Sequence, residues 1–506
     1  MTFGPVTAIE WPRSRDFGGK RPDNLQAATI YCTPRYRQGS CPSRHYLRLT
    51  FNTHNYTTLA QLLRQIAVKA LVVSCRDNEA LAWPSPFFRS SGLNANGMAM
   101  LLDLPPEILE QILLELDPID VAAVSQTCVI LSTIPYSVSS DLFWRKLYLE
   151  LALDDPRECV NAMGDPILEF NWKRELQRLI RARAIVNNPV CCRPEERIEL
   201  WRTLLDIASN TVPLSSVTSD LSYNLVWLGV LLRGGSLLEY SLWELSPEER
   251  QLRAHFHTLF GLTVADFSPT RLLETRCTVY TLRYYHQANI FGPFMSDHSG
   301  RVNWEHVLAI QHVISMHVVP SQLPEEFARE DKFFVGSPMS LPFCNSVMEK
   351  GERLGEVDDW AGVEGTWRCS FCFCDHRDLL VFNNYGVIDG EPRREVFEDP
   401  EFHEVFTVVD FNIKVAKTEE DPEHQTRCII HFEGAAKNHQ STLEGYVRLT
   451  PEGHVRWRFL SNSTWSSEGV QVGNVRSTYG VLGIWTTVQH EDSDPVGPFW
   501  LRKLLD

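Results

Sequence analysis

The chain has 506 residues, of which 43% are apolar and 22% charged, and its formal net charge is -16. This length predicts about three domains, and the ordinary apolar content excludes a largely disordered chain. The acidic excess argues against nucleic acid as a main partner, because a nucleic-acid binder needs a basic stripe. The longest apolar run, 225–232, is far short of the roughly 20 residues of a membrane span.

Cysteine usage points to a reducing compartment. The 13 cysteines are odd in number and follow no disulfide framework, and no apolar run follows a basic start at the N-terminus. We therefore expect the protein in the cytoplasm or the nucleus. We expect no membrane association.

Residues 1–97 differ from the rest because arginine and lysine outnumber acids there and periodicity is weak. We expect this basic segment to be poorly ordered. Two hypotheses fit the pattern. The segment is a disordered arm, or the native chain begins at Met98 or Met100, which stand directly before the next helical stretch.

Residues 104–147 predict short helices that meet at a sharp corner. Pro105 and Pro106 preset the first helical turn, where Glu107 suits the positive end of the helix. Apolar side chains then recur at steps of three and four residues: Ile108, Leu109, Ile112, Leu113 and Leu116. Asp117 and Pro118 end this helix and begin another.

The opening Leu104-Pro105-Pro106-Glu107-Ile108-Leu109, the corner Asp117-Pro118 and the closing Phe143-Trp144-Arg145 together resemble the F-box. This resemblance implies an F-box domain at 98–150 that docks on a Skp1-like adaptor and, through it, on a cullin. The side chains it assigns to that contact are Leu104, Pro105, Glu107, Ile108, Leu109, Ile112, Leu113, Leu116, Pro118, Val124 and Trp144. The alternative is an amphipathic helix pair that only fills its own protein's core.

Residues 151–320 predict a helical linker domain. Apolar spacing favours helices at 195–208, 219–232, 247–260 and 302–315, while the aromatic tract 277–285 predicts a short strand or strap. The aromatic density of this tract and of 289–294 suggests an interdomain seam. Proline and glycine at intervals over 321–361 indicate a linker between domains.

From residue 362 the apolar period changes to two, which predicts an antiparallel all-β domain over 362–506. The expected strands are at 367–374, 379–382, 405–415, 428–432, 443–449, 455–460, 470–472, 481–488 and 499–501. A small up-and-down barrel is favoured, because closure leaves no long free edge. The fold class is therefore α+β, with a helical F-box and helical linker before a β-barrel or sandwich.

The C-terminal tracts 465–476, 479–485 and 494–500 are similar to the ends of fungal F-box proteins that place a β-barrel after a helical linker. Residues 289–294 and 302–305 also match that group. The resemblance implies a substrate-recognition subunit of an SCF-type ubiquitin ligase. In such a complex another subunit carries ubiquitin, and this chain contributes by proximity and orientation.

Cys369, Cys372, Cys374 and His376 form the only tight cysteine and histidine cluster in the sequence. On an extended strand Cys369 points away from the other three, so free thiols are favoured over a zinc site. The sequence carries no hydrolase elbow, phosphate loop or zinc-protease motif. We therefore expect no catalytic residues, no metal and no cofactor, and we interpret the chain as a non-enzyme.

Arginine and aromatic residues near the C-terminus are the candidate contacts for an unknown protein substrate, because these residue types dominate binding hot spots. They are Arg456, Trp457, Arg476, Tyr479, Trp485 and Trp500. At a barrel mouth they suit an acidic or phosphorylated segment, whereas the alternative is that they fill the core. Two other functions stay open: a barrel that binds a small apolar ligand, and a zinc or cysteine enzyme built on Cys372 to His376.

Overall fold

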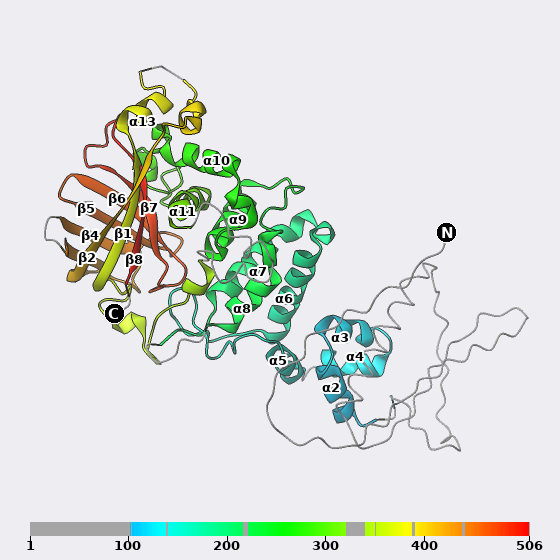
Figure 1. The fold of residues 1–506 in the computed structure, drawn as a ribbon. Helices are drawn as coiled ribbons and strands as arrows, with labels where there is room; N and C mark the ends of the chain where they lie inside the picture. The colour runs from blue at the N-terminus through cyan, green and yellow to red at the C-terminus, as the bar shows by residue number, and fades with distance from the viewer. Residues whose placement is uncertain are drawn as a thin grey trace, which may run out of the picture. The chain divides into compact units, whose positions relative to one another are not determined.

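The computed structural model describes residues 102, 104–137, 140–215, 221–319, 340–349, 351–386, 390–437 and 441–504. The expected basic segment 1–97 and most of the first half of the expected linker 321–361 lie outside these residues. Figure 1 shows the described elements: helices α2 to α11 precede the strands in chain order, and helix α13 lies between β1 and β2. The expected α+β class is confirmed.

Four short helices follow one another over the F-box-like stretch. They are α2 (Pro106–Leu114), α3 (Pro118–Ser125), α4 (Val129–Tyr136) and α5 (Asp141–Leu149). The expected corner is present, since the Asp117 side chain accepts a hydrogen bond from the Ile119 N–H at 3.0 Å and caps α3. Pro135 lies in the last turn of α4, which ends one residue later.

Longer helices make up the next segment: α6 (Trp172–Asn187), α7 (Arg197–Ser209), α8 (Tyr223–Leu231), α9 (Pro247–Phe260), α10 (Pro269–Tyr280) and α11 (Trp304–Val318). The helices expected near 195, 219, 247 and 302 are confirmed. The expected strand at 277–285 is wrong. Ser268 caps α10 through a hydrogen bond from the Arg271 N–H at 3.2 Å, and Cys277, Val279 and Tyr280 are buried in the last turns of that helix.

Short 3-10 helices also occur along the described chain. They are η2 (Pro189–Cys191), η3 (Pro194–Glu196), η4 (Arg233–Gly235), η5 (Val264–Phe267), η6 (Leu282–Tyr284), η7 (Gln287–Asn289), η9 (Leu341–Phe343), η10 (Leu354–Glu356) and η11 (Arg394–Glu398). None of the described helices has the length and apolarity to cross a bilayer.

Eight strands close into an antiparallel barrel in which every strand pairs with its neighbours in sequence and β8 pairs with β1. The strands are β1 (Gly365–Cys374), β2 (Glu404–Glu419), β3 (Ile429–Ala436), β4 (Thr442–Leu449), β5 (Val455–Ser461), β6 (Trp465–Val472), β7 (Gly480–Thr487) and β8 (Gly497–Lys503). The favoured up-and-down barrel is confirmed.

One expected strand, 379–382, is wrong because this segment belongs to helix α13 (His376–Phe382). The Asp375 side chain accepts a hydrogen bond from the Arg377 N–H at 2.8 Å and caps the helix. Leu379 and Phe382, three residues apart, are then buried on one face. A four-residue apolar run carries no periodicity that separates a strand from a helix.

Aromatic rings fill the barrel interior. Trp457 lies at its centre, with ring centroids 4.9 Å from Trp367 and 5.4 Å from Phe432. Phe459 and Phe499 make an edge contact at 5.2 Å. These rings belong to one buried cluster. It contains inward-facing residues from every strand of the barrel except β6. The lumen is a packed core, which disfavours the alternative of a small apolar ligand held inside it.

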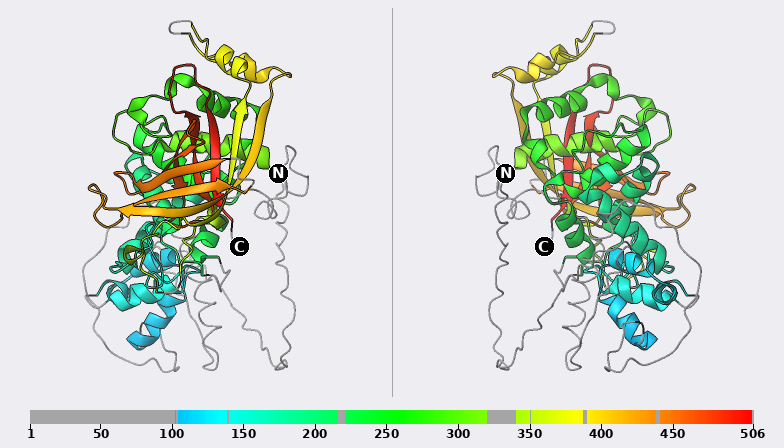
Figure 2. Two further views of the ribbon diagram at one scale, coloured as in Figure 1. Left: turned by 90° about the vertical axis from the view of Figure 1, so that its left-hand side faces the viewer. Right: turned by 90° about the vertical axis from the view of Figure 1, so that its right-hand side faces the viewer.

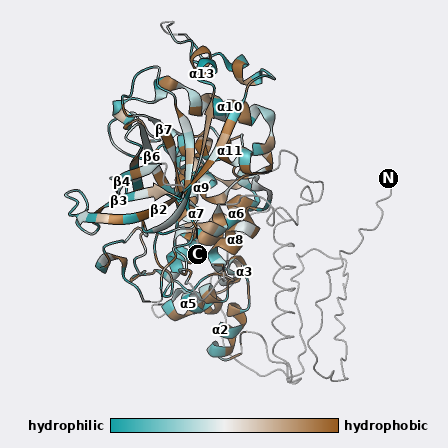
Figure 3. Cartoon of the chain, turned by 60° about the vertical axis from the view of Figure 1, so that its left-hand side comes forward, coloured by the Kyte–Doolittle hydropathy of each residue, from teal (hydrophilic) through white to brown (hydrophobic). Residues whose placement is uncertain are grey.

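The outer face of part of the barrel is covered by the helical segment. Helix α11 packs against β7, β8 and β1, and one hydrophobic core joins Val307 and Ile310 of α11 with Leu482 and Ile484 of β7. Brown, hydrophobic stretches mark helices and strands alike in Figure 3. In a strand that is covered on both faces nearly every residue is buried, as in β6. In β5 buried and half-buried residues alternate instead.

The expected separation into a helical domain, a linker and a β domain is therefore corrected. The helical segment and the barrel share one core and fall in a single compact unit. The described part of the expected linker is also packed inside it, with Leu341, Cys344, Leu354 and Trp360 buried. Proline and glycine in this stretch shape turns around those buried side chains.

Candidate functional site

The outer surface of helices α2 to α5 is unusually apolar. Val129 is 80% exposed and Leu142 is 65% exposed. Further exposed apolar side chains on the same module are Leu102, Ile119, Ile130, Tyr136 and Leu149. No described part of the chain covers them, and exposed apolar patches of this kind mark interaction sites.

The opposite side of the module is packed. Leu113 and Leu116 lie in a cluster with Phe143, Trp144 and Leu147, and this cluster continues into helix α6 through Leu176 and Leu179. The barrel contributes no residue to this cluster. The indole of Trp144 donates to the carbonyl of Pro135 at 2.8 Å, so the closing aromatic holds the end of α4.

The residues assigned to adaptor docking therefore divide into two groups. Leu109, Leu113, Leu116, Pro118 and Trp144 are buried within the chain, and the expectation that they contact a partner directly is corrected. Their apolar faces build the module instead. The side chains that stay half-buried or exposed are Leu104, Pro105, Glu107, Ile108, Ile112 and Val124.

Helix α6 holds this module through polar contacts as well. Arg183 Nη2 lies 2.6 Å from Asp117 Oδ1, at the corner between α2 and α3. The ammonium of Lys173 lies over the rings of Tyr136 and Trp144, 4.8 and 5.6 Å from their centroids. The apolar surface is thereby fixed to the helices that carry the barrel.

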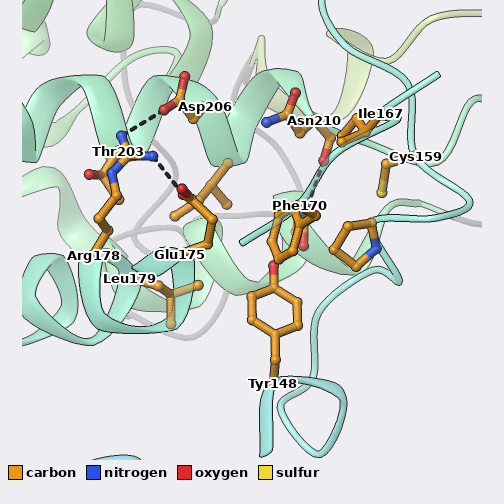
Figure 4. Close-up of a pocket in the computed structure, with 13 residues that line it drawn as sticks. Tyr148, Cys159, Ile167, Phe170, Glu175, Arg178, Leu179, Thr203, Asp206 and Asn210 are labelled. Atoms are coloured by element: carbon orange, nitrogen blue, oxygen red, sulfur yellow. Dashed lines mark hydrogen bonds and ion pairs between the residues drawn. The ribbon is translucent and has the colours of Figure 1, made fainter. Parts of the chain in front are cut away.

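A small void lies behind this joint, between α5, α6 and α7 (Figure 4). Arg178 lies between two carboxylates there, 2.6 Å from Glu175 and 2.7 Å from Asp206. Tyr148 points toward the same void, and burial raises its pKa. The void measures about 40 Å³, which holds only a water or two. The site is therefore part of the joint rather than a ligand pocket.

The two arginines expected to bind substrate are engaged inside the chain. Arg456 forms a bidentate pair with the buried Glu468, at 2.9 and 3.0 Å. Arg476 donates to the carbonyls of Asp359 and Trp360, at 2.6 and 3.2 Å, and to the Glu352 carboxylate at 2.7 Å. Both guanidiniums therefore have structural partners within the chain.

The four aromatic candidates do not gather at a mouth of the barrel. Trp457 is fully buried in the lumen. Tyr479 accepts a hydrogen bond from Gln311 at 3.0 Å, and burial raises its pKa to about 12. The indoles of Trp485 and Trp500 donate to the carbonyls of Cys372 and Tyr479. Tyr479 and Trp500 contact each other in the core shared with the helices, with ring centroids 5.4 Å apart, whereas Trp457 lies in the lumen core. The expectation that all four rings gather at a barrel mouth is therefore corrected.

Sequence reasoning missed a pocket at the end of the barrel where β1 ends and β8 begins. Its volume is about 580 Å³, and it is lined by residues from three parts of the chain: 282–291, 383–386 together with 390–392, and 486–496. Phe291 and His490 stack there with ring centroids 3.8 Å apart. Both have a φ of 54°, and Asn384 has a φ of 47°. The left-handed backbone conformation costs free energy in residues other than glycine, and residues that adopt it often cluster at functional sites.

This pocket carries polar groups of both signs. Arg283, His286 and His490 line it together with Glu491 and Asp494. No described atom pairs with His490 Nδ1, which is buried. The aromatic density at 289–294 was the one sequence signal for this place, as an expected seam between helices and barrel. The other two segments come from distant loops that carry no motif.

The cysteine cluster does not converge on one point. Cys369 belongs to the lumen core and Cys374 to the core shared with the helices, on the opposite face of β1. His376 begins α13, where its Nε2 lies 2.7 Å from the Ser493 carbonyl. Burial raises the pKa of Cys369 and of Cys374 to about 12, so both thiols are protonated at neutral pH. Neither suits a nucleophile.

Cys372 has different neighbours, His317 and Glu404, whose donor atoms lie within 4.8 Å of each other and of its sulfur. Arg276 Nη2 lies 2.8 Å from the buried Glu404 carboxylate, and His317 Nε2 lies 2.9 Å from it. Burial raises the pKa of Glu404, but the contact with His317 and the charge of Arg276 outweigh this and hold it below its ordinary value. The guanidinium already supplies the positive charge that a metal would bring.

A second compact group is formed by Glu239, His257 and Asp266. The Asp266 carboxylate accepts a hydrogen bond from the Thr263 N–H at 2.7 Å and lies 3.2 Å from His257 Nε2. It closes a capping box at η5, so its ligand capacity is used within the fold.

Residues 101–150 match the family model described as F-box-like. The match covers α2 to α5, the module with the exposed apolar surface. No curated protein and no solved structure matches the chain.

Proposed function

We propose, on the premise that this chain is an F-box protein with a C-terminal β-barrel domain, that it is the substrate-recognition subunit of an SCF-type ubiquitin ligase. The F-box-like domain supports an adaptor role in such ligases. In this proposal it docks on a Skp1-like adaptor and, through it, on a cullin, while the barrel side of the chain holds a protein substrate.

The observation that carries the proposal is the two-sidedness of the F-box-like module. Its inner face is fixed to α6 by Leu176, Leu179 and Arg183, whereas its outer face leaves Val129 and Leu142 exposed. A helix pair that only filled its own core would leave no such surface. The alternative in which the pair is wholly internal is therefore disfavoured.

A fixed spacing between adaptor and substrate suits this role. The module is joined to the helices, and the helices share a core with the barrel, so a substrate on the barrel is held at a defined place. Such an arrangement contributes to ubiquitin transfer by proximity and orientation. No catalytic group is required of this chain, and we propose that it is not an enzyme and acts in the cytoplasm or the nucleus.

We propose that the substrate lies at the end of the barrel where β1 ends and β8 begins. The strained pocket built by Phe291, Asn384 and His490 lies there. It replaces the six C-terminal residues expected from the sequence as the centre of substrate binding, because those six have structural partners.

Copurification with a Skp1-like adaptor tests the adaptor half of the proposal. The double variant Leu104→Ala, Pro105→Ala removes an apolar side chain and the residue that presets the start of α2. We expect its affinity for the adaptor to fall by about 2–4 kcal/mol, as for losses of buried leucine. Leu242→Ala, at a highly exposed leucine outside the module, is the matched control. Equal adaptor affinity of the double variant and the control would refute docking at this surface.

A further inference from the structure

The first half of β2 has a neighbouring strand on one side only. β1 pairs with residues 404–413 of β2, whereas the pairing with β3 begins at Phe411. Figure 2 shows β1 and β2, coloured yellow to orange, running side by side toward the helical segment that follows β1. Among the described residues, the stretch from Glu404 to Asp410 therefore has an open edge within a barrel that is otherwise closed.

The backbone groups on this edge can be assigned from one hydrogen bond. The Asp410 carbonyl accepts from the Lys437 N–H at 3.0 Å, so Asp410 directs its backbone groups away from β1. Because successive residues of a strand alternate, Phe406 and Val408 direct their N–H and C=O groups to the same side. No described residue makes a hydrogen bond to them there.

This edge lacks the features that keep exposed strands from pairing with other chains. Residues 405–409 are Val-Phe-Thr-Val-Val, without lysine, arginine or proline, and the bulge of β2 lies farther along, at Val415 to Lys417. Val405 is 42% exposed and Val408 is 44% exposed. The edge is therefore apolar and regular, and no residue that the structure describes covers it.

The end of α11 adds to this apolar surface. His317 stacks on the Phe406 ring with centroids 5.4 Å apart, and the next residue, Val318, is 46% exposed. A side chain of an added strand would meet Val408 and Val318 on this face. On the other face of the ribbon it would meet Val405.

We propose that the open edge of β2 binds an extended segment of the recruited protein by strand addition. The segment would cover Glu404 to Val409, about 20 Å, and alternate apolar residues. We infer a basic residue at the end of the segment beside Glu404, because the chain enters β2 through the exposed carboxylates of Glu398, Asp399 and Glu401. This proposal adds to the proposed function that the substrate binds as an extended strand. It rests on the proposed function only for the statement that the bound protein is the substrate of the ubiquitin ligase.

Proline at position 408 provides the central variant. Val408→Pro removes the outward N–H, and proline is tolerated where a strand's N–H faces away from its partner. The barrel should therefore fold. An added strand, however, loses one hydrogen bond and collides with the proline ring. Val408→Thr keeps the N–H and suits a strand, and it is the matched control.

The probe is a library of random twelve-residue peptides displayed on phage, selected on the full-length chain. We expect enriched peptides to lack proline, to alternate apolar residues and to carry lysine or arginine at one end. Synthetic copies should bind Val408→Pro at least tenfold more weakly than the wild type, and Val408→Thr within threefold of it. Enrichment of peptides that bind Val408→Pro and the wild type equally, or no enrichment at all, would overturn the proposal.

Hydrogen exchange at the Phe406 and Val408 amides gives a second measurement. We expect both amides to exchange rapidly in the free chain and slowly once a selected peptide is bound. Slow exchange in the free chain would mean that another part of this chain or a second copy occupies the edge, and this would overturn the proposal. Adaptor binding, measured on the same Val408→Pro protein, should be unchanged. Unchanged adaptor binding by the F-box double variant Leu104→Ala, Pro105→Ala would count against the proposed function and leave strand addition intact.

Discussion

Arg183 of α6 lies 2.6 Å from the carboxylate of Asp117, the residue that caps α3 and turns the chain from α2 into α3. One carboxylate thus serves the corner of the F-box-like module and its attachment to the helical segment. The two functions can be separated by substitution.

Asp117→Ala removes both the cap and the ion pair, whereas Arg183→Gln removes only the ion pair. We expect Asp117→Ala to cost about 1–2 kcal/mol of stability, mostly from the lost cap, and Arg183→Gln at most about 1 kcal/mol, because both side chains are partly exposed. Hydrogen exchange of the α3 amides measures the difference. Equal effects of the two substitutions would show that the cap contributes nothing.

The pair of Arg456 and Glu468 provides a prediction on the barrel. Arg456→Ala leaves the Glu468 carboxylate buried with only the longer contact to Arg458, at 3.3 Å. We expect a loss of about 3–5 kcal/mol of stability, because a buried charge is left without its main partner. The double variant Arg456→Ala, Glu468→Gln should recover part of that loss in thermal unfolding. No recovery would mean that Arg456 acts through packing on Phe294, over whose ring it lies, rather than through charge.

Gly483 and Gly469 face each other on β7 and β6, beneath the ring of Phe499. A Cβ at position 483 would collide with the carbonyl oxygen of Glu468 and approach Phe499 within 2.5 Å. We expect Gly483→Ala to destabilise the chain by about 1–3 kcal/mol or more, because a backbone atom cannot move aside. Gly453→Ala is the control, since its Cβ meets nothing within 4 Å and only its φ of 82° opposes the change. A melting temperature of Gly483→Ala at or above that of the control would contradict the steric account.

His306 of α11 predicts a pH dependence. Burial lowers its pKa to about 4, below the ordinary value of about 6.5 that it takes in the unfolded chain. Between these values the unfolded chain binds a proton that the folded chain does not, so stability falls as pH falls through this window. The slope from this residue is about 1.4 kcal/mol per pH unit.

His306→Gln removes this titration and keeps a polar group near the Tyr285 hydroxyl, which lies 3.0 Å from His306 Nε2. We expect the stability difference between wild type and variant to shrink as pH falls from 6.5 to 4.5. Urea unfolding at several pH values measures it. A difference that stays constant over this range would show that the histidine titrates normally in the folded chain.

Several elements followed from the sequence because they depend on nearby residues. The start of α2 after Pro105, the corner at Asp117 and the end of α4 after Pro135 are local effects of proline and a capping carboxylate. The strands of the barrel followed from apolar alternation and from turns between them, and closure followed from the need to leave few edges.

The misassigned elements were short and apolar. Residues 277–280 and 379–382 have the composition of strands but lie in the helices α10 and α13, because Ser268 and Asp375 cap these helices and buried side chains pack against the shared core. Composition gives a preference of a fraction of a kcal/mol per residue, which caps and burial readily exceed.

For the candidate sites too, some features followed from the sequence and others depended on the tertiary structure. By itself the sequence determined that an F-box-like module exists and that an up-and-down barrel follows it, because both rest on residue patterns that repeat over short distances. Only the tertiary structure decided which of those residues face outward. It turned Leu109, Trp144 and Trp457 inward and paired Arg456 with Glu468. It also left one edge of β2 without a partner strand among the described residues. Burial and strand pairing depend on contacts between residues far apart in the chain.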